Sequence, residues 1–210
     1  MAKKPFDVTA ISDTEAAVTL PYNKTIEMVK IEGRQIEVQK DRSVKTDRMC
    51  FGLAYHRDNL YVSCHDDCGN SEVIVLDTKG QLVSRIPGTD NFQVPHYIAV
   101  DHTGRLYISD CGINTLFCMT VSGQTVYTRT KTDTGLDMHQ GLLVDSEQNV
   151  YIAGAQSHNL QILNKDGQIY KKLAKKREGL PCLVPMSYNA RDMTLLVGLS
   201  GDYIQSYRFV

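Results

Sequence analysis

The 210-residue chain has no tryptophan and no long hydrophobic run. A membrane-spanning helix needs roughly 18 or more consecutive apolar residues. No stretch approaches that length, so we expect no membrane-spanning helix. Lys3 and Lys4 near the start are not followed by an apolar segment, and we therefore predict no signal peptide. Without tryptophan, the 11 tyrosines and 5 phenylalanines must supply the aromatic packing.

The chain also lacks a strong excess of either charge, with 23 Lys and Arg against 24 Asp and Glu. A net charge of −1 creates no global field that would attract nucleic acid or an anionic membrane. A hydrophobic content of 42% with 22% charged residues is typical of a soluble globular protein. We therefore predict one domain, residues 1–210, in the cytoplasm.

Cysteine is present but irregularly spaced, at Cys50, Cys64, Cys68, Cys111, Cys118 and Cys182. In a long chain without an export signal, such spacing indicates reduced thiols in a cytosolic protein rather than a disulfide framework. The segment from Cys64 to Cys68 groups residue types that bind metals. No second Cys/His pair follows it at zinc-finger spacing, so we interpret it as a polar surface loop and predict no metal and no cofactor.

The dominant feature that is present is a repeated pair of strands. In Pro95–Asp110, two alternating apolar runs flank the polar turn Asp101–Gly104, and a period of two residues predicts antiparallel strands. The run Leu106–Ser109 recurs every 44 to 46 residues, at Ala16–Thr19, Leu60–Ser63, Val150–Ala153 and Leu195–Gly198. Self-similarity at this period, with about four strands per unit, is typical of a β-propeller.

The predicted fold is therefore all-β, a propeller of five recognisable units. Four units have room for four strands and the last unit for three. Turns such as Asp77–Gly80 are predicted to close the third strand onto the fourth, because Asp and Gly suit tight hairpins. The predicted blades cover approximately residues 5–48, 49–94, 95–138, 139–182 and 183–210.

The unit from Pro95 to Gly123 resembles the NHL repeat in its pattern Pro-x-x-Ile-Ala-Val-Asp-x-x-Gly-x-Leu-Tyr-Ile-Ser-Asp. The stretch from Pro5 to Pro21 is similar to the C-terminal propeller of invertebrate tripartite-motif (TRIM) proteins. The resemblance implies a six-bladed ring, of which this chain would hold about five blades. It also implies a module that recruits a substrate protein, or RNA in some members, for a ubiquitin ligase whose RING domain lies outside this chain.

Catalytic chemistry has few candidates in the sequence. A propeller enzyme would hold a central cation with several ligands at the starts of its innermost strands. At those positions only Asp7, His96, His139 and Gln140 are polar, and no Gly-x-Ser-x-Gly motif occurs. We therefore predict that the chain is not an enzyme, and we keep a propeller hydrolase or lyase with a central cation as an alternative.

RNA binding is the other alternative. The basic residues Lys171, Lys172, Lys175, Lys176 and Arg177 would neutralise phosphates. Lysines on an outer strand also protect its edge against unwanted pairing. Sequence-specific reading of RNA requires stacking aromatic side chains as well, so protein recognition is our primary prediction.

Protein recognition requires surface loops on a rigid scaffold. The loops after the second strands and between units gather on one face of a propeller, and we expect aromatic and Arg side chains there to contribute most to binding. We predict a protein partner and no small-molecule substrate. The predicted partner-binding residues are Tyr22, Lys24, Arg48, His65, Asp67, Asn70, Phe92, His96, Tyr97, Asn114, His139, His158 and Arg177.

Overall fold

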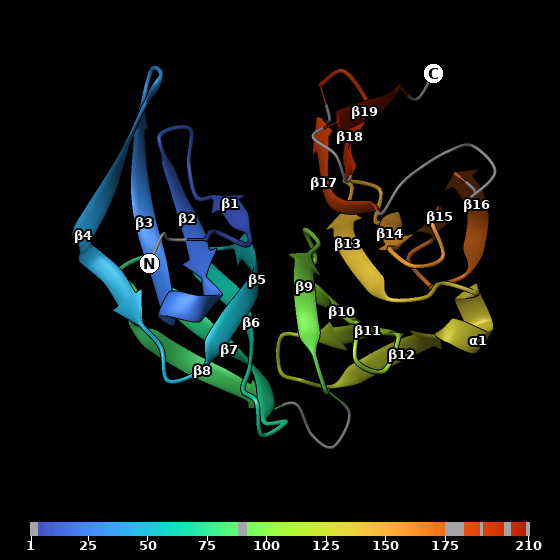
Figure 1. The fold of residues 1–210 in the computed structure, drawn as a ribbon, viewed down its shortest axis with the longest axis horizontal. Helices are drawn as coiled ribbons and strands as arrows, with labels where there is room; N and C mark the ends of the chain where they lie inside the picture. Colours follow the sequence, from blue (N-terminus) through green and yellow to red (C-terminus); the bar gives the residue numbers. More distant parts are fainter. Residues whose placement is uncertain (1–3, 88–91, 175–182, 190, 200–202, 209–210) are drawn as a thin grey trace. The chain divides into compact units, whose positions relative to one another are not determined.

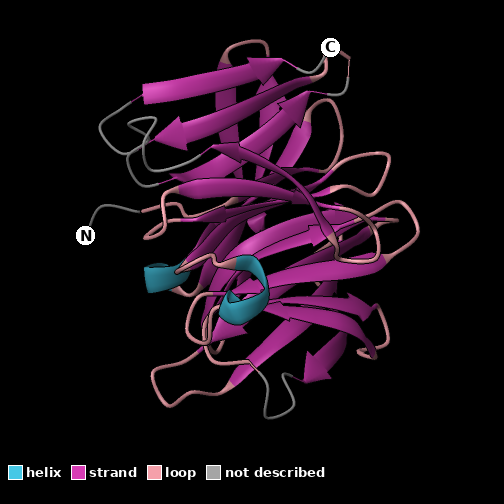
Figure 2. Cartoon of the chain, turned by 90° about the vertical axis from the view of Figure 1, so that its right-hand side faces the viewer, coloured by secondary structure: helices cyan, strands magenta, loops and turns pink. Residues whose placement is uncertain are grey.

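The computed structural model describes residues 4–87, 92–174, 183–189, 191–199 and 203–208 (Figure 1). Antiparallel strands dominate these residues (Figure 2). The helical segments among them are the 3-10 turn η1 (Pro21–Asn23) and the four-residue helix α1 (Lys131–Thr134). In this part of the chain, no helix has the length and apolar character needed to cross a membrane.

The strands form five sheets, as the 44-to-46-residue period predicts. The strand orders are β1-β2-β3-β4, β5-β6-β7-β8, β12-β11-β10-β9, β13-β14-β15-β16 and β17-β18-β19. Each sheet is an antiparallel meander, and the last has three strands within the described residues. The all-β propeller of five blades is thereby confirmed, including its three-stranded final blade.

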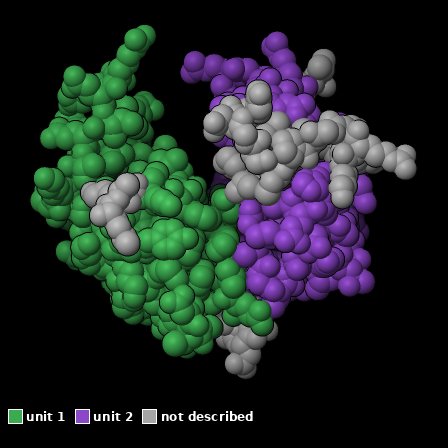
Figure 3. All heavy atoms as spheres, in the orientation of Figure 1, with its two compact units in different colours: residues 1–100 green, residues 101–210 purple. Residues whose placement is uncertain are grey.

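The chain divides into two compact units, residues 1–100 and 101–210 (Figure 3). The strands of unit 1 are β1 (Val8–Ala10), β2 (Glu15–Leu20), β3 (Thr25–Glu32), β4 (Gln35–Lys45), β5 (Met49–His56), β6 (Asn59–His65), β7 (Ser71–Asp77), β8 (Leu82–Pro87) and β9 (Pro95–Val100).

Unit 2 begins with the second strand of the third sheet. Its strands are β10 (Arg105–Asp110), β11 (Thr115–Thr120), β12 (Thr125–Thr130), β13 (His139–Val144), β14 (Val150–Gly154), β15 (Asn159–Leu163), β16 (Ile169–Ala174), β17 (Leu183–Asn189), β18 (Thr194–Leu199) and β19 (Tyr203–Arg208).

Apolar side chains on both faces of the inner strands form the core. In β6, Leu60 and Val62 are fully buried against Ile26 and Met28 of the first sheet. In unit 2 an equivalent cluster joins Leu160 and Ile162 of β15 to Leu195 and Val197 of β18, among other residues. Truncating one such side chain to Ala costs about 2–5 kcal/mol of stability, so these clusters hold neighbouring sheets together within each unit.

The same type of turn connects the third strand to the fourth in sheets of both units. In unit 1, Asp77 Oδ1 accepts hydrogen bonds from the amides of Lys79 and Gln81 at 2.9 and 2.8 Å, and Gly80 has φ +82°. In unit 2, Asn164 Oδ1 accepts two amides in the same way, from Asp166 and Gln168. A short polar side chain and a glycine at positive φ are what this turn requires.

A second repeated feature is a hydrogen bond between a tyrosine and an aspartate. Tyr107 donates its hydroxyl hydrogen bond to Asp101 Oδ2 at 3.1 Å, and Tyr151 donates to Asp145 Oδ2 at the same distance. Asp101 Oδ1 also accepts the amide of Arg105. The Asp and Tyr of the repeated pattern therefore have a structural role, because each satisfies the polar atom of the other.

Adjacent sheets are also joined at their outer strands. Arg42 of β4 donates to the carbonyl of Thr78 at 2.8 Å, and Arg129 of β12 donates to the carbonyl of Gly167 at 2.6 Å. In both places the outer strand of one sheet reaches the turn of the next. A Cβ atom on Gly167 would lie 2.6 Å from the Tyr127 ring, so glycine permits both the turn and the contact.

Gly167→Ala should destabilise the protein more than the matched variant Gly69→Ala. Both glycines have positive φ, +77° and +84°, but a Cβ on Gly69 has no atom within 4 Å. At Gly69, the strained backbone conformation alone should lower the free energy of unfolding by about 1–2 kcal/mol. At Gly167, overpacking adds to this strain, and the loss should be about 2–4 kcal/mol. Urea unfolding of both variants measures the difference. Equal losses would show that the approach of Tyr127 does not constrain the turn.

Candidate recognition surface

Five ring-bearing side chains meet in unit 1, namely Phe6, Phe51, His65, His96 and Tyr97. Phe51 stacks on His65 with centroids 4.5 Å apart and an interplanar angle of 3°, and on His96 at 4.7 Å. Phe6 contacts Phe51, His96 and Tyr97 at 5.1 to 5.4 Å. These five residues are called the ring cluster below. They come from the segment before β1 and from β5, β6 and β9.

A bulge in β5 brings these strands together. The pairing of β5 with β6 shifts between Cys50 and Leu53, which leaves the backbone of Phe51 and Gly52 outside the regular ladder. A Cβ atom on Gly52 would lie 2.6 Å from the carbonyl oxygen of His96. Glycine at this position therefore allows β9 to approach β5 closely.

Side chains complete the hydrogen bonds that the bulge interrupts. Thr19 donates to the carbonyl of Phe51 at 2.6 Å, and Ser63 accepts the amide of Gly52 at 3.0 Å. Asp7 accepts the amide of Leu53 at 2.9 Å. Because buried backbone groups need partners, these three side chains hold the start of β5 and the ring cluster in place.

Burial disfavours the charged forms of two titratable groups here. It raises the pKa of Asp7 to about 6, although the amides of Leu53 and Val8 act in the opposite direction. It lowers the pKa of His96 to about 4, and the neighbouring His65 lowers it further. At neutral pH, His96 is therefore a neutral imidazole packed among aromatic rings.

Charged side chains lie next to the ring cluster. Arg48 forms ion pairs with Glu72 at 2.7 Å and with Asp66 at 3.7 Å, and Arg85 pairs with the same Glu72 carboxylate. The Glu72 side chain is only 9% exposed. Two arginines compensate this nearly buried charge, and the arrangement fixes the Arg48 guanidinium at the surface.

Tyr22 is presented on a rigid turn at the same end of the strands. Lys24 ends η1 in the left-handed conformation, with φ 48°, and its amide donates to the carbonyl of Pro21. Its ammonium group donates to the carbonyl of Asp47 at 3.0 Å, and the amide of Thr46 donates to the carbonyl of Lys24. Tyr22 itself is 76% exposed, so an aromatic side chain projects from a well-held loop.

The β6–β7 loop is a closed turn of its own. Asp66 Oδ1 accepts the amides of Cys68 and Asn70, both at 2.9 Å, and Oδ2 accepts the side-chain amide of Asn70. Asp67 and Asn70 are exposed. Within the described residues, no group of three or more His, Cys, Asp or Glu side chains is arranged to hold a metal ion.

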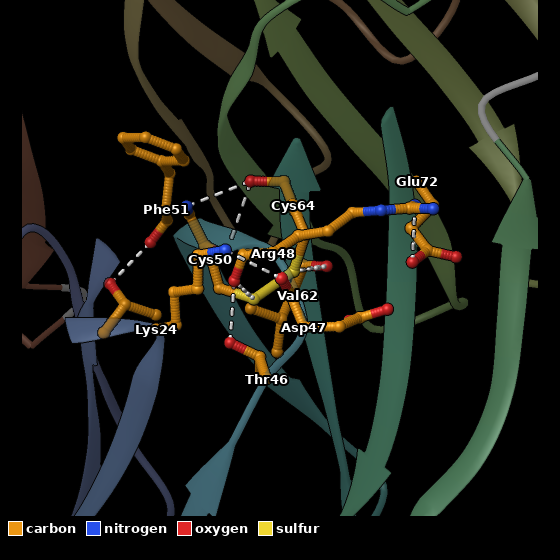
Figure 4. Close-up of a disulfide and its surroundings, with 12 residues drawn as sticks. Lys24, Thr46, Asp47, Arg48, Cys50, Phe51, Val62, Cys64 and Glu72 are labelled. Carbon is orange, nitrogen blue, oxygen red and sulfur yellow. Dashed lines mark hydrogen bonds and ion pairs between the residues drawn. A yellow bond between two sulfur atoms is a disulfide. The ribbon is translucent and has the colours of Figure 1, made fainter. Parts of the chain in front are cut away.

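The cysteines correct one sequence-based prediction. Cys50 of β5 and Cys64 of β6 are directly paired and form a disulfide (Figure 4), so the prediction of uniformly reduced thiols is wrong for this pair. Antiparallel pairing places the two Cα atoms 4.1 Å apart, a juxtaposition that sequence spacing alone does not reveal. Cys68, Cys111 and Cys118 are free thiols.

Three of the residues predicted to bind a partner are buried instead of exposed. Phe92 and Tyr97 are buried, with 6% and 9% exposure, and His139 is fully buried beside Thr134. Burial lowers the pKa of His139 to about 4. These three side chains therefore support the structure from inside and are left out of the surface proposed below.

Unit 2 carries two further predicted residues, Asn114 and His158, both at positive φ. Asn114 accepts the amide of Met138, so its side chain holds a loop. Arg177 lies outside the described residues, as do Lys175 and Lys176.

Sequence reasoning missed Phe6 and Phe51 as members of the site. A signal was present, since Phe6, Phe51 and His96 occupy equivalent positions at the start of successive inner strands. Comparing these positions across the repeats for rings, and not for polar ligands alone, identifies three of the five members of the ring cluster.

Comparison with solved structures supports the fold. A chain of the nidogen–laminin complex is 18% identical, with a TM-score of 0.72, over 89% of this chain and 71% of that chain. Virginiamycin B lyase from Staphylococcus aureus, solved with quinupristin as a catalytically inactive form, is 13% identical with a TM-score of 0.71, over 99% and 70%. A luciferin-regenerating enzyme is 13% identical with a TM-score of 0.69, over 96% and 72%. No protein-family model matches the chain.

These neighbours correct the prediction that the chain is not an enzyme. The same fold occurs in a lyase and in a luciferin-regenerating enzyme, and the prediction rested on a sparse set of polar residues at inner-strand starts. At 13% identity these likenesses concern the fold alone. We therefore withdraw the exclusion of catalysis.

Asp7→Asn should remove a pH dependence of stability. The pKa of Asp7 rises from 3.8 to about 6 on burial, so the folded state binds this proton more tightly than the unfolded state does. The resulting stabilisation is complete below about pH 4 and is lost as the pH rises through about 6. Between pH 4 and 7, we expect the free energy of unfolding of the wild type to fall by about 2–3 kcal/mol relative to the variant.

Urea unfolding at a series of pH values measures that difference. Asp67→Asn, at an exposed aspartate of the same unit, is the matched control and should give a curve parallel to that of the wild type. A parallel curve for Asp7→Asn as well would contradict the assignment of Asp7 as a buried, proton-binding carboxylate.

Proposed function

We propose that this chain is a protein-recognition propeller that binds its partner through the loops of unit 1. The contact surface consists of Tyr22, Lys24, Arg48, Asp67 and Asn70, with His65 and His96 of the ring cluster beneath it. This set is called the recognition surface below. The main observation that supports the proposal is that Tyr22 is 76% exposed. It lies on a turn that hydrogen bonds hold to a neighbouring loop.

Rigidity is what makes this surface suitable for binding. Tyrosine and arginine are enriched among residues that dominate binding energy, and ordering a loop or side chain on binding weakens affinity. Here Lys24 is tied to Asp47, and Arg48 is held by Glu72 and Asp66. Little further ordering is needed when a partner arrives.

The mixed charge of the surface supports a protein partner. The surface carries the cations Lys24 and Arg48, and Arg48 pairs with Asp66, which the exposed Asp67 follows in the chain. A nucleic acid requires a continuous basic patch, whereas alternating signs suit a protein partner with complementary charges. The nidogen–laminin complex, in which a structural neighbour of this chain occurs, is an example of a protein assembly that uses this fold.

The sequence resemblance adds a finer proposal. The NHL-like unit from Pro95 to Gly123, and the TRIM-like stretch from Pro5 to Pro21, support recruitment of a substrate protein to a cytoplasmic TRIM-like ubiquitin ligase. In that setting the recognition surface would select the substrate. The transfer of ubiquitin would belong to a RING domain outside this chain.

Tyr22→Ala should weaken partner capture at least tenfold, because truncating an aromatic hot spot typically costs about 2 kcal/mol or more. Asp67→Arg, which reverses an exposed charge on the same surface, should weaken it as well. The matched control is Tyr170→Ala on β16, where the tyrosine is 55% exposed in unit 2. Quantitative mass spectrometry after capture on the immobilised chain, followed by titration with the purified partner, provides the measurement.

Two results would contradict the proposal. One is a partner whose affinity falls equally in Tyr22→Ala and Tyr170→Ala. The other is salt-dependent binding of an RNA pool that is abolished when Lys171 and Lys172 become Glu, which would identify the basic strand β16 and an RNA ligand instead.

A further inference from the structure

The disulfide of unit 1 lies directly behind the recognition surface. Cys50 precedes Phe51 in β5, and Cys64 precedes His65 in β6. Because side chains alternate across a strand, the sulfurs point to one face of the sheet and the stacked Phe51 and His65 rings to the other. The disulfide and the ring stack therefore act on the same short piece of backbone.

Arg48 of the recognition surface and its ion-pair partner Glu72 are joined to the same backbone. Arg48 lies two residues before Cys50, and Glu72, which binds the Arg48 guanidinium, is the β7 partner of Cys64. Figure 4 shows Arg48 extending from the Cys50 strand towards Glu72. A change in the separation of the two cysteines would thus move both ends of this ion pair.

The backbone ladder between β5 and β6 is interrupted next to the disulfide. The β5–β6 ladder pairs Met49 with His65 and Cys50 with Cys64, and then shifts before Leu53. Beyond the disulfide, the bulge relies on side-chain hydrogen bonds such as that between Ser63 and Gly52. Because β6 stays paired with β7 up to His65, the covalent link adds mainly to the constraint on the start of β5.

The site is also suited to the reduced form. Cys50 Sγ lies 3.8 Å from the carbonyl oxygen of Arg48, and Cys64 Sγ lies 3.8 Å from that of Val62. In a dithiol, each S–H group would have a carbonyl acceptor within reach, which is needed because both cysteines are only 1% exposed. Neither oxidation state leaves a buried polar group unsatisfied there.

We propose that Cys50 and Cys64 form a reversible dithiol–disulfide pair that controls the order of the recognition surface, with a low-molecular-weight disulfide as oxidant. This inference rests on the proposed function only in naming that surface as the place of binding. In the oxidised state the cross-link holds β5 and β6 together under Phe51 and His65. In the reduced state the end of the strand pair opens more often, and the ring stack and the Arg48–Glu72 pair loosen with it.

The chemistry is thiol–disulfide exchange. The thiolate of one cysteine attacks a sulfur of oxidised glutathione, forms a mixed disulfide and releases one glutathione thiolate. The second cysteine thiolate then attacks the mixed disulfide and releases the other glutathione. Two protons and two electrons leave the protein, and one glutathione disulfide becomes two thiols. Since both sulfurs are buried, each attack requires a local opening of the strand ends.

Equilibration of the full chain in glutathione buffers of graded redox ratio tests this proposal. After an acid quench and alkylation, peptide mass spectrometry measures the reduced fraction of each cysteine, and hydrogen exchange is followed in residues 47–53 and 63–72. We expect Cys50 and Cys64 to titrate together in one two-electron transition. Amide exchange in these two segments should rise at least tenfold on reduction, while residues 105–120 of unit 2 should not respond.

Variants separate the pair from the other thiols. Cys50→Ser and Cys64→Ser should show the fast exchange of the reduced form in every buffer. Cys111→Ser, at a free cysteine in unit 2, should titrate like the wild type. If the serine variants do not fold, the wild-type titration alone decides the question.

Three results would overturn the inference. They are a disulfide that excess dithiothreitol leaves intact under native conditions, a pair that oxidised glutathione does not close, and a reversible titration without any change in exchange. None of these readouts involves a partner. A normal titration combined with Tyr22-independent capture would therefore count against the proposed function alone, and a failed titration would count against the redox pair alone.

Discussion

The bulge in β5 is the constraint on which the rest of unit 1 depends. At Gly52 this strand approaches β9 so closely that a single added carbon would meet the backbone of His96 and its neighbours. The approach removes regular ladder partners from a buried strand, and an unsatisfied buried amide or carbonyl costs roughly 1–3 kcal/mol. Thr19 and Ser63 supply the missing partners, together with the buried carboxylate of Asp7.

Much of the fold was predictable because its determinants are local and repeated. Alternation of apolar residues predicted the strands, and the recurrence of Leu106–Ser109 predicted five sheets. The turn at Asp77–Gly80 follows from the chemistry of two residue types. Each of these features is decided within a few residues, so one sequence carries the information.

The site was less predictable because it depends on contacts between distant segments. Phe6 and His65 join the same ring cluster although 59 positions separate them in the chain. The Cys50–Cys64 disulfide depends on strand register and not on cysteine spacing. The exclusion of catalysis failed for another reason, since a few polar residues at strand starts do not decide the chemistry of a fold shared by enzymes and binding proteins.

Burial and ion pairing together set the charge around this surface. Burial lowers the pKa of His96 to about 4 and raises that of Asp7 to about 6, so at neutral pH the imidazole among the rings is uncharged and the Asp7 carboxylate is largely ionised. At the rim, Arg48 is compensated by Glu72 and Asp66. A partner would therefore meet a surface whose interior is held by packing and whose specificity comes from its rim. Because Cys50 and Cys64 lie on the strands that connect these two parts, their oxidation state can alter the geometry of the rim without changing its charge.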